Sequence, residues 1–364
     1  MRSIHLILLT IIAMVLIQCA KVQKPVEMQV KAEKIYTIEG KPDSANSITP
    51  EAAFDLTYAV QTDKDGFLYL RDEKTGSIKV FDKAGKYYSS VASSGDGTDQ
   101  IKSMDTFFAD KDTVYIFDSR TKIKKFLRPG EYVSASDIPY DQSTVPLAVS
   151  VLNDSTLLGR VSTLNYSSEP VLINLELALF DRKFNKKMIM LTDALNKEVI
   201  QRSYFVEPVF AVNDKYIYTA KRSRDEYRIK LYTHSGEFVR DIVQDYIPVK
   251  FSDEESRIIK MSQTGNPHYK DFFEYKLALH DIKTDKYGYL WVQRSDGNFG
   301  SDISFDIFDG DRLFLTLSMK YEEIAQNTRW VYLSDQIYVF DHKNDKIDVY
   351  DYTIEPAKKQ TPDP

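Results

Sequence analysis

Cysteine is almost absent from this chain, because Cys19 is the only one among 364 residues. One thiol can form neither a disulfide within the chain nor the multi-cysteine shell of a structural zinc site. Histidine is also scarce, with five residues in all and no His-Glu-x-x-His motif. A Gly-rich phosphate loop and a Gly-x-Ser-x-Gly elbow are missing as well. The sequence therefore contains no ready-made catalytic motif.

Long apolar stretches are equally rare, since the only one runs from Ile4 to Ile17. It is too short to cross about 30 Å of hydrocarbon as a helix, and polar residues follow it. Arg2 precedes the stretch, which is typical of the positively charged start of a signal peptide. We therefore expect a signal peptide over residues 1–18 and no permanent transmembrane helix.

Cys19 directly follows this stretch, in the order Leu16-Ile17-Gln18-Cys19. The segment resembles the lipobox of bacterial lipoproteins, in which the cysteine becomes the lipid-modified first residue. Leu16 and Ile17 fit that pattern, whereas Gln18 stands where a small residue is usual. The resemblance implies an exported protein that is lipid-anchored at Cys19 to the bacterial membrane, periplasmic or at the cell surface. The alternative is an incidental cysteine.

The charges argue against a nucleic-acid partner. Acidic residues outnumber basic ones, 54 to 48, and the two signs are interspersed along the chain. Residues 19–33 are polar and predict a lipidated N-terminus with a short tether, and residues 356–364 predict a flexible tail. The intervening residues 34–355 are numerous enough for one large core.

An internal repeat dominates this central region. Its clearest copy reads strand, Asp-Gly turn, strand, turn, strand, Gly turn, strand, over Val60–Asp72 and Ile78–Lys86. Its β-branched and aromatic second strand recurs at Val114–Asp118, Tyr216–Thr219, Tyr289–Val292 and Ile337–Asp341, with Leu157-Leu158 as a weak copy. Periodic strands of this kind favour a propeller; a seven-bladed ring or a sandwich is the alternative.

Counting the elements gives six units, of which the last is one strand short. Four strands each are expected near residues 55–92, 104–138, 146–191, 206–243 and 277–318, but only three near 328–352. The β-rich segment Lys34–Glu39 is the natural missing strand. We therefore predict an all-β, six-bladed β-propeller of four-stranded antiparallel blades, closed by an N-terminal strand that completes the last blade.

Two hairpins carry a family resemblance. Asp63-Lys-Asp-Gly66 precedes Leu68-Tyr69, and Asp285-Lys-Tyr-Gly288 precedes Leu290-Trp291. These units resemble the NHL-like six-bladed propellers of bacterial lipoproteins over about residues 34–355. The resemblance implies a fold but no single function, because such rings serve both as binders and as enzymes.

Alternating strand direction places several unusual loops on one face of such a ring. They are Ser162–Pro170, the insert at 244–275 between blades four and five, and Ser295–Ser301. Within the insert, Ser252 and Glu255 match a capping box and predict a short helix. The insert is expected either to be pinned to the ring by its aromatics or to form a rim over the centre.

The ends of the second strands differ in charge between blades. Asp72, Asp118 and Asp341 are expected to accept backbone N–H groups as turn caps. Arg222 and Arg294, together with Arg160 in blade three, could instead form a cationic patch for a carboxylate. The alternative for these arginines is a set of surface ion pairs.

His280 is the histidine best placed for a role, because Ala278–Ile282 is expected to be an innermost strand. Two interpretations are open for His280, a satisfied polar residue and a ligand contact. Six-bladed relatives include lactone hydrolases and lyases that hold a divalent cation in the central channel. Asp55, His280 and Asp281 are the matching residues here, and they are too few to assign a metal site, so the metal stays unknown.

The leading functional hypothesis is a non-catalytic module that binds an envelope protein, a peptide or an anionic glycan, without a cofactor. The alternative is a metal-dependent hydrolase or lyase of the lactonase-like type. A third candidate is a purely structural subunit of the envelope.

Overall fold

The structure is a computed structural model that describes Ala53 and residues 28–40, 59–72, 74–139, 144–169, 171–196, 208–262, 274–295, 302–320, 329–341 and 344–356. Its contacts divide the chain into two units, 1–31 with 353–364, and 32–352. The second unit carries the blades. The signal peptide, Cys19 and the tail after residue 356 lie outside the described residues.

Six antiparallel sheets of four strands make up the fold. Blade one contains β2 (Val60–Thr62), β3 (Leu68–Arg71), β4 (Ile78–Phe81) and β5 (Tyr87–Val91). Blade two contains β6 (Met104–Asp110), β7 (Thr113–Asp118), β8 (Lys122–Leu127) and β9 (Tyr132–Asp137). Blade three contains β10 (Thr144–Val151), β11 (Thr156–Asn165), β12 (Leu172–Asp181) and β13 (Lys186–Asn196).

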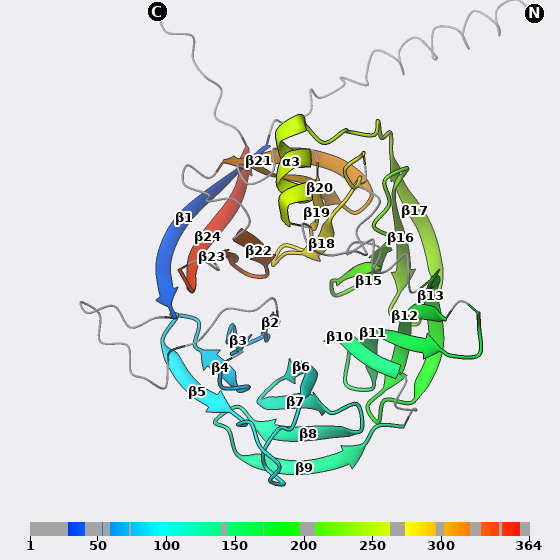
Figure 1. Cartoon of the computed structure of the whole chain (residues 1–364). Coiled ribbons are helices and arrows are strands. Elements are labelled where there is room, and N and C mark those ends of the chain that lie inside the picture. Colours follow the sequence, from blue (N-terminus) through cyan, green and yellow to red (C-terminus); the bar gives the residue numbers. More distant parts are fainter. Residues whose placement is uncertain are drawn as a thin grey trace, which may run out of the picture. The chain divides into compact units, whose positions relative to one another are not determined.

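The remaining blades repeat this order. Blade four contains β14 (Val209–Val212), β15 (Tyr216–Ala220), β16 (Tyr227–Thr233) and β17 (Phe238–Gln244). Blade five contains β18 (Asp281–Thr284), β19 (Leu290–Arg294), β20 (Asp302–Asp309) and β21 (Arg312–Lys320). Blade six contains β22 (Arg329–Leu333), β23 (Ile337–Asp341), β24 (Lys346–Pro356) and β1 (Met28–Glu39). The blades of residues 32–352 form a ring with the first strand of each blade nearest its centre (Figure 1).

The predicted closure of the ring is confirmed, because β1 pairs with β24 as the outermost strand of blade six. Thr37 Oγ1 donates to Asp348 Oδ1 at 2.7 Å, and Lys34 forms an ion pair with the same carboxylate. Ile38 is buried in a core shared with blade one. The strand begins at Met28, earlier than the expected Lys34, so part of the predicted tether is β-structure.

The Asp-Gly hairpins owe their regularity to a hydrogen bond from an aromatic side chain. Asp63 accepts from the Phe67 backbone N–H at 2.9 Å and from Tyr69 Oη at 2.7 Å. Asp285 repeats the arrangement, because Trp291 Nε1 donates to its Oδ2 at 2.8 Å. The residues that carried the family resemblance therefore fix the first hairpin of blades one and five. Burial, and next the bond to Asp63, raise the pKa of Tyr69.

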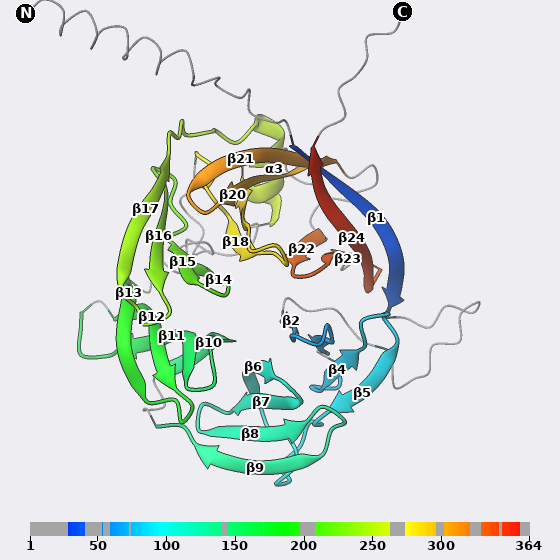
Figure 2. The ribbon, with the colours of Figure 1, turned by 180° about the vertical axis from the view of Figure 1, so that it is seen from behind.

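Strand alternation gives the ring two distinct faces. The turns after the first and third strands lie on one face, which we call the hairpin face. The turns after the second strands and the connections between blades lie on the other, which we call the connection face. In Figures 1 and 2 the ring is seen from its two sides.

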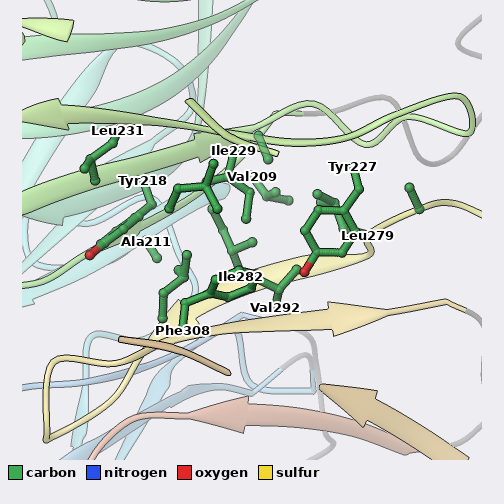
Figure 3. Close-up of a cluster of buried hydrophobic side chains, with 14 residues drawn as sticks. Val209, Ala211, Tyr218, Tyr227, Ile229, Leu231, Leu279, Ile282, Val292 and Phe308 are labelled. Carbon is green, nitrogen blue, oxygen red and sulfur yellow. The ribbon is translucent and has the colours of Figure 1, made fainter. Parts of the chain in front are cut away.

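Apolar side chains from adjacent blades meet between the sheets to form the core. Figure 3 shows the cluster between blades four and five, where Val209 and Tyr218 of one blade face Ile282 and Phe308 of the next. Polar side chains on the innermost strands add further ties. Gln61 Nε2 lies 3.2 Å from Phe107 O and 3.3 Å from Val149 O, so one amide connects blades one, two and three.

Blade three differs most from the sequence prediction. Its second strand looked like a weak copy, yet β11 and β12 have 10 residues each and β13 has 11. Ser162–Asn165 continue β11, although a loop was expected to begin at Ser162. Pairing of Asn165 with Leu172 explains the difference, since it extends the ladder beyond the length of the other blades' second strands.

The insert between blades four and five contains the predicted helix α3 (Asp253–Ser262). The capping box is formed, because Glu255 N donates to Ser252 Oγ at 3.2 Å and Ser252 N donates to Glu255 Oε2 at 2.7 Å. Glu255 also forms a buried ion pair of 2.7 Å with Lys276. Backbone bonds from Phe251 to Glu274 and from Lys276 to Val249 close the neck of the insert.

Candidate functional site

Arg160 joins blade three to blade four on the connection-face half of the ring. Its Nη1 donates to the carbonyl oxygen of Pro208 at 3.0 Å, immediately before β14 begins. Arg160 sits in β11 opposite Ala148 and is half-buried. The guanidinium is therefore positioned by a main-chain acceptor of the next blade.

Arg222 makes the corresponding contact between blades four and five. It follows the end of β15 at Ala220, and its Nε donates to the carbonyl oxygen of His280 at 2.7 Å. The neighbouring loop is fixed to the insert, because Arg224 Nε donates to Tyr275 O at 3.1 Å. Arg222 and the neck of the insert therefore share the connection face, as the sequence predicted.

Arg294, at the end of β19, lies beside a buried carboxylate. Its Nη1 is 3.3 Å from Asp306 Oδ1, and Asp306 is only 4% exposed. Tyr227 Oη and Thr316 Oγ1 also donate to Asp306, at 3.1 Å and 2.8 Å. Arg294 is therefore in an ion pair, as the alternative expected, whereas the bonds described for Arg160 and Arg222 go to carbonyl groups.

The four candidate residues belong to one continuous set of contacts. Pro208, which Arg160 binds, precedes Val209, and Val209 pairs with Ala220, two residues before Arg222. His280, which Arg222 binds, donates its backbone N–H to Gln293 O at 2.7 Å, next to Arg294. The structure therefore places Arg222, His280 and Arg294 around the junction of blades four and five, and Arg160 at the junction of blades three and four.

His280 lies immediately before β18, and its Nδ1 is shielded from solvent. Burial, followed by the charge of Arg222, lowers the pKa of His280 from 6.5 to about 4, against the opposing effect of Asp281. Burial alone would raise the pKa of Asp281, but Lys283 at 2.9 Å and then Arg222 hold that pKa below its ordinary value. The imidazole is therefore neutral and Asp281 is ionised at neutral pH.

Sequence reasoning missed Arg71, which has the same role in blade one. Its Nη1 donates to Met104 O at 3.1 Å, at the start of blade two. Arg71 and Arg160 occupy equivalent places, three residues after Leu68 and Leu157, the first residues of their second strands that pair with the innermost strand. That spacing is visible in the sequence, but the prediction at this strand end concerned only the adjacent Asp72.

Two of the turn aspartates, Asp72 and Asp341, have the local role that was predicted for them, whereas Asp118 binds the connection that leads into blade two. Asp118 Oδ1 accepts the backbone N–H groups of Lys102 and Ser103 at 3.0 Å and 2.9 Å. Asp72 accepts from the N–H of Lys74, and Asp341 accepts from Asn344. These carboxylates therefore organise turns.

No group of three or more His, Cys, Asp or Glu side chains within the described ranges is arranged to hold a metal ion. Asp55, the third residue considered for a cation, lies outside these ranges, as do His268, His342 and residues 296–301 of the Ser295–Ser301 loop. Among the described helices, none has the length and apolar character needed to cross a membrane.

Comparison with known proteins agrees with this architecture. Residues 58–191 match the family DUF5128, described as a 6-bladed beta-propeller. A DUF4221-family protein of Bacteroides vulgatus has a TM-score of 0.60 at 11% identity, with 92% of this chain and 100% of that chain covered. No curated protein matches the sequence.

Two further solved structures have lower scores. One is a Bacteroides fragilis protein described as a candidate exported protein, with a TM-score of 0.49, 11% identity, and 92% and 98% coverage of the two chains. The other is a streptogramin B lyase, with a TM-score of 0.46, 12% identity, and 89% and 98% coverage. At such identities the likeness concerns the fold and not the activity. The chain is a six-bladed β-propeller.

Proposed function

We propose that this protein is an exported, lipid-anchored and non-catalytic binding module whose connection face recognises an anionic group of an envelope protein, a peptide or a glycan. The observation that supports this most is the placement of Arg160, Arg222 and Arg294 on three successive blades. Arginine suits the role, because its planar guanidinium keeps its charge at physiological pH and matches a carboxylate in two-point geometry.

Rigidity supports the same proposal. Arg160 and Arg222 are each held by a bond to the main chain of the next blade, at 3.0 Å and 2.7 Å. Side chains that are already ordered lose little conformational freedom when a ligand binds. Backbone bonds at the neck of the insert, from Phe251 to Glu274 and from Lys276 to Val249, likewise order its base.

The test uses Arg222→Gln, which removes the charge but keeps an N–H donor for the His280 carbonyl. Lys215→Gln is the matched control, because Lys215 is an exposed cation in a turn of the same blade on the hairpin face. An oligogalacturonate and an oligoglutamate peptide serve as carboxylate probes in calorimetric titrations of folded proteins with equal melting temperatures.

We expect wild type and Lys215→Gln to bind one of these probes alike, with an affinity that falls as salt is added. Arg222→Gln should raise the Kd about tenfold or more, equivalent to about 1.4 kcal/mol. Equal affinities of Arg222→Gln and wild type, or no binding of either probe, would contradict the proposal.

A further inference from the structure

The junction of blades one and two carries a guanidinium group beside a carboxyl group. Arg71 Nη1 donates to Met104 O at 3.1 Å, and Met104 is the first residue of β6. Asp105 is the next residue of the strand, and its Oδ2 accepts the backbone N–H of Arg120 at 2.7 Å. Burial raises the pKa of Asp105, and Arg120 and then Arg71 oppose that rise. Arg71 and Asp105 are both half-buried, so this junction, which we call the Arg71 site, is open to solvent in part.

The junction of blades four and five repeats this arrangement. Arg222 Nε donates to His280 O at 2.7 Å, and the next residue, Asp281, is the first of β18. Burial would raise the pKa of Asp281, but Lys283 and then Arg222 hold it below its ordinary value. Arg222 and Asp281 are half-buried, like their counterparts in the Arg71 site. We call this junction the Arg222 site.

The two sites lie on opposite sides of the ring. The connections between blades are on the connection face, so β6 and β18 both begin there. Both are innermost strands, and Figure 1 shows them across the centre of the ring from each other. Three blades separate the two junctions in either direction around the ring. A ligand that contacts both sites must therefore cross the centre of the connection face.

The innermost strands on one side of that centre lie close together. Gln61 of β2 bonds both to Phe107 O of β6 and to Val149 O of β10, so one amide reaches two further innermost strands. Thr106 Oγ1 of β6 also donates to Leu147 O of β10, at 3.4 Å. Because the strands converge in this way, a ligand chain of a few units is long enough to span the two sites.

Each site combines two groups that suit an acidic sugar. A guanidinium group binds a carboxylate in two-point geometry, and the oxygens of an aspartate accept hydrogen bonds from hydroxyl groups. A uronic acid unit carries a carboxylate and hydroxyl groups on one ring, whereas a glutamate side chain carries no hydroxyl. The pairing of Arg71 with Asp105, and of Arg222 with Asp281, therefore favours an acidic glycan over an acidic peptide.

We propose that the ligand is an acidic glycan whose chain crosses the centre of the connection face from the Arg222 site to the Arg71 site, with one carboxylate on each arginine. This inference rests on the proposed binding function and deepens it, because it names the ligand class and adds Arg71 to the binding residues. Once one carboxylate is bound, the second contact forms within the same complex at a high effective concentration.

The experiment combines two probes with matched variants of the full-length protein. Hexagalacturonate can contact both sites, whereas galacturonic acid has one carboxylate and can occupy only one site at a time. Arg71→Gln removes the charge and keeps an N–H donor for the Met104 carbonyl. Lys74→Gln is the control, because Lys74 is an exposed cation in the turn after β3, on the same face of the same blade. Binding is measured by calorimetric titration of proteins with equal melting temperatures.

We expect wild type and Lys74→Gln to bind hexagalacturonate alike, and about tenfold or more tightly than galacturonic acid. Arg71→Gln should lose most of this gain with chain length, so that its Kd for hexagalacturonate rises about tenfold. The loss should be accompanied by a weaker dependence of the Kd on salt, because one ionic contact is removed.

Arg222→Gln, titrated with the same probes, separates two kinds of failure. If Arg222→Gln weakens the binding of hexagalacturonate and Arg71→Gln does not, the inference is overturned and the proposed function stands. The same holds if wild type binds galacturonic acid as tightly as hexagalacturonate, or binds only an oligoglutamate peptide. If Arg222→Gln binds every probe as wild type does, or wild type binds none, the proposed function and this inference are overturned together.

Discussion

The two faces of the ring join neighbouring blades by different chemistry. On the hairpin face, Arg128 of blade two contacts the Asp63 carboxylate of blade one at 2.9 Å, and Arg182 of blade three contacts Asp110 of blade two at 2.7 Å. On the connection face, Arg71 and Arg160 instead donate to carbonyl oxygens of the following blade. The main-chain acceptors of Arg71 and Arg160 therefore contrast with the carboxylate acceptors of Arg128 and Arg182, although Arg294 of the connection face also pairs with a carboxylate.

The two kinds of acceptor differ in what they do to the charge of the arginine. An ion pair neutralises both partners, and Asp63, whose side chain is 1% exposed, is buried beside Arg128. A bond to a carbonyl positions a guanidinium without cancelling its charge. The charge of Arg222, which is held in that way, acts on its neighbours, because it lowers the pKa of both His280 and Asp281.

Removing β1 should have the largest effect, because this strand closes the ring. A chain that begins at residue 45 loses the pairing with β24 and the buried Ile38. We expect a loss of more than about 5 kcal/mol, seen as aggregation or non-cooperative melting. A chain that begins at Met28 retains β1 and serves as the control in calorimetry.

Equal melting temperatures of the two truncated chains would show that the sheet of blade six does not need its fourth strand. In that case β1 would not be needed to hold blade six in the ring.

Arg128→Met tests the hairpin face directly. Asp63, with a side chain 1% exposed, would lose its cation, and such uncompensated burial costs about 3–5 kcal/mol. Arg71→Met is the matched change on the connection face, where loss of one charged hydrogen bond to a carbonyl should cost about 1–3 kcal/mol. Chemical denaturation of both variants measures the two values.

The comparison between the faces fails if Arg71→Met destabilises the ring as much as Arg128→Met does. The comparison becomes stronger if the double variant Asp63→Asn, Arg128→Met regains the stability that Arg128→Met alone loses. The double variant removes both charges of the hairpin-face ion pair.

His280, on the connection face, should give the smallest of the three effects, which is a dependence of the unfolding free energy on pH. Its pKa is about 4 in the folded protein and 6.5 ordinarily, so the unfolded chain binds the proton first as the pH falls. The contribution of His280 to the free energy of unfolding is fully present above pH 6.5 and is lost as the pH falls toward 4. Between pH 7 and pH 5 this amounts to about 2 kcal/mol.

His280→Asn, which has no proton to gain, is the control for this titration. The difference in unfolding free energy between wild type and His280→Asn should change by that amount between the two pH values. A constant difference would mean that His280 titrates normally in the folded ring.

The sequence predicted the repeated parts of the molecule well, because their physics is local. Asp63 and Tyr69 lie six residues apart in one hairpin, so the turn and its hydrogen bond could be read from one segment. Six blades, the closing strand and the capping box of α3 follow from such short patterns. The candidate arginines were found for the same reason, since each stands at or near the end of a recognisable strand.

The hydrogen-bond acceptors of these arginines could not be predicted from the sequence, because they come from distant segments. Arg160 binds Pro208, and Arg222 binds His280, across separations of 48 and 58 residues. The buried Asp306 beneath Arg294 was indistinguishable from many exposed carboxylates until Tyr227 of another blade was placed beside it. Blade three was underestimated because its ladder is lengthened by residues of mixed polarity that resemble a loop.

The pairing of β1 with β24 also fixes an order of events in biosynthesis. Thr37 and Asp348, which bond across the closing seam, are separated by 311 residues, so β1 leaves the ribosome long before its partner strand β24. Until then its edge is exposed, and five blades can form while the sixth cannot. Quality control that acts on unpaired strand edges could therefore distinguish complete chains from those cut short near the C-terminus.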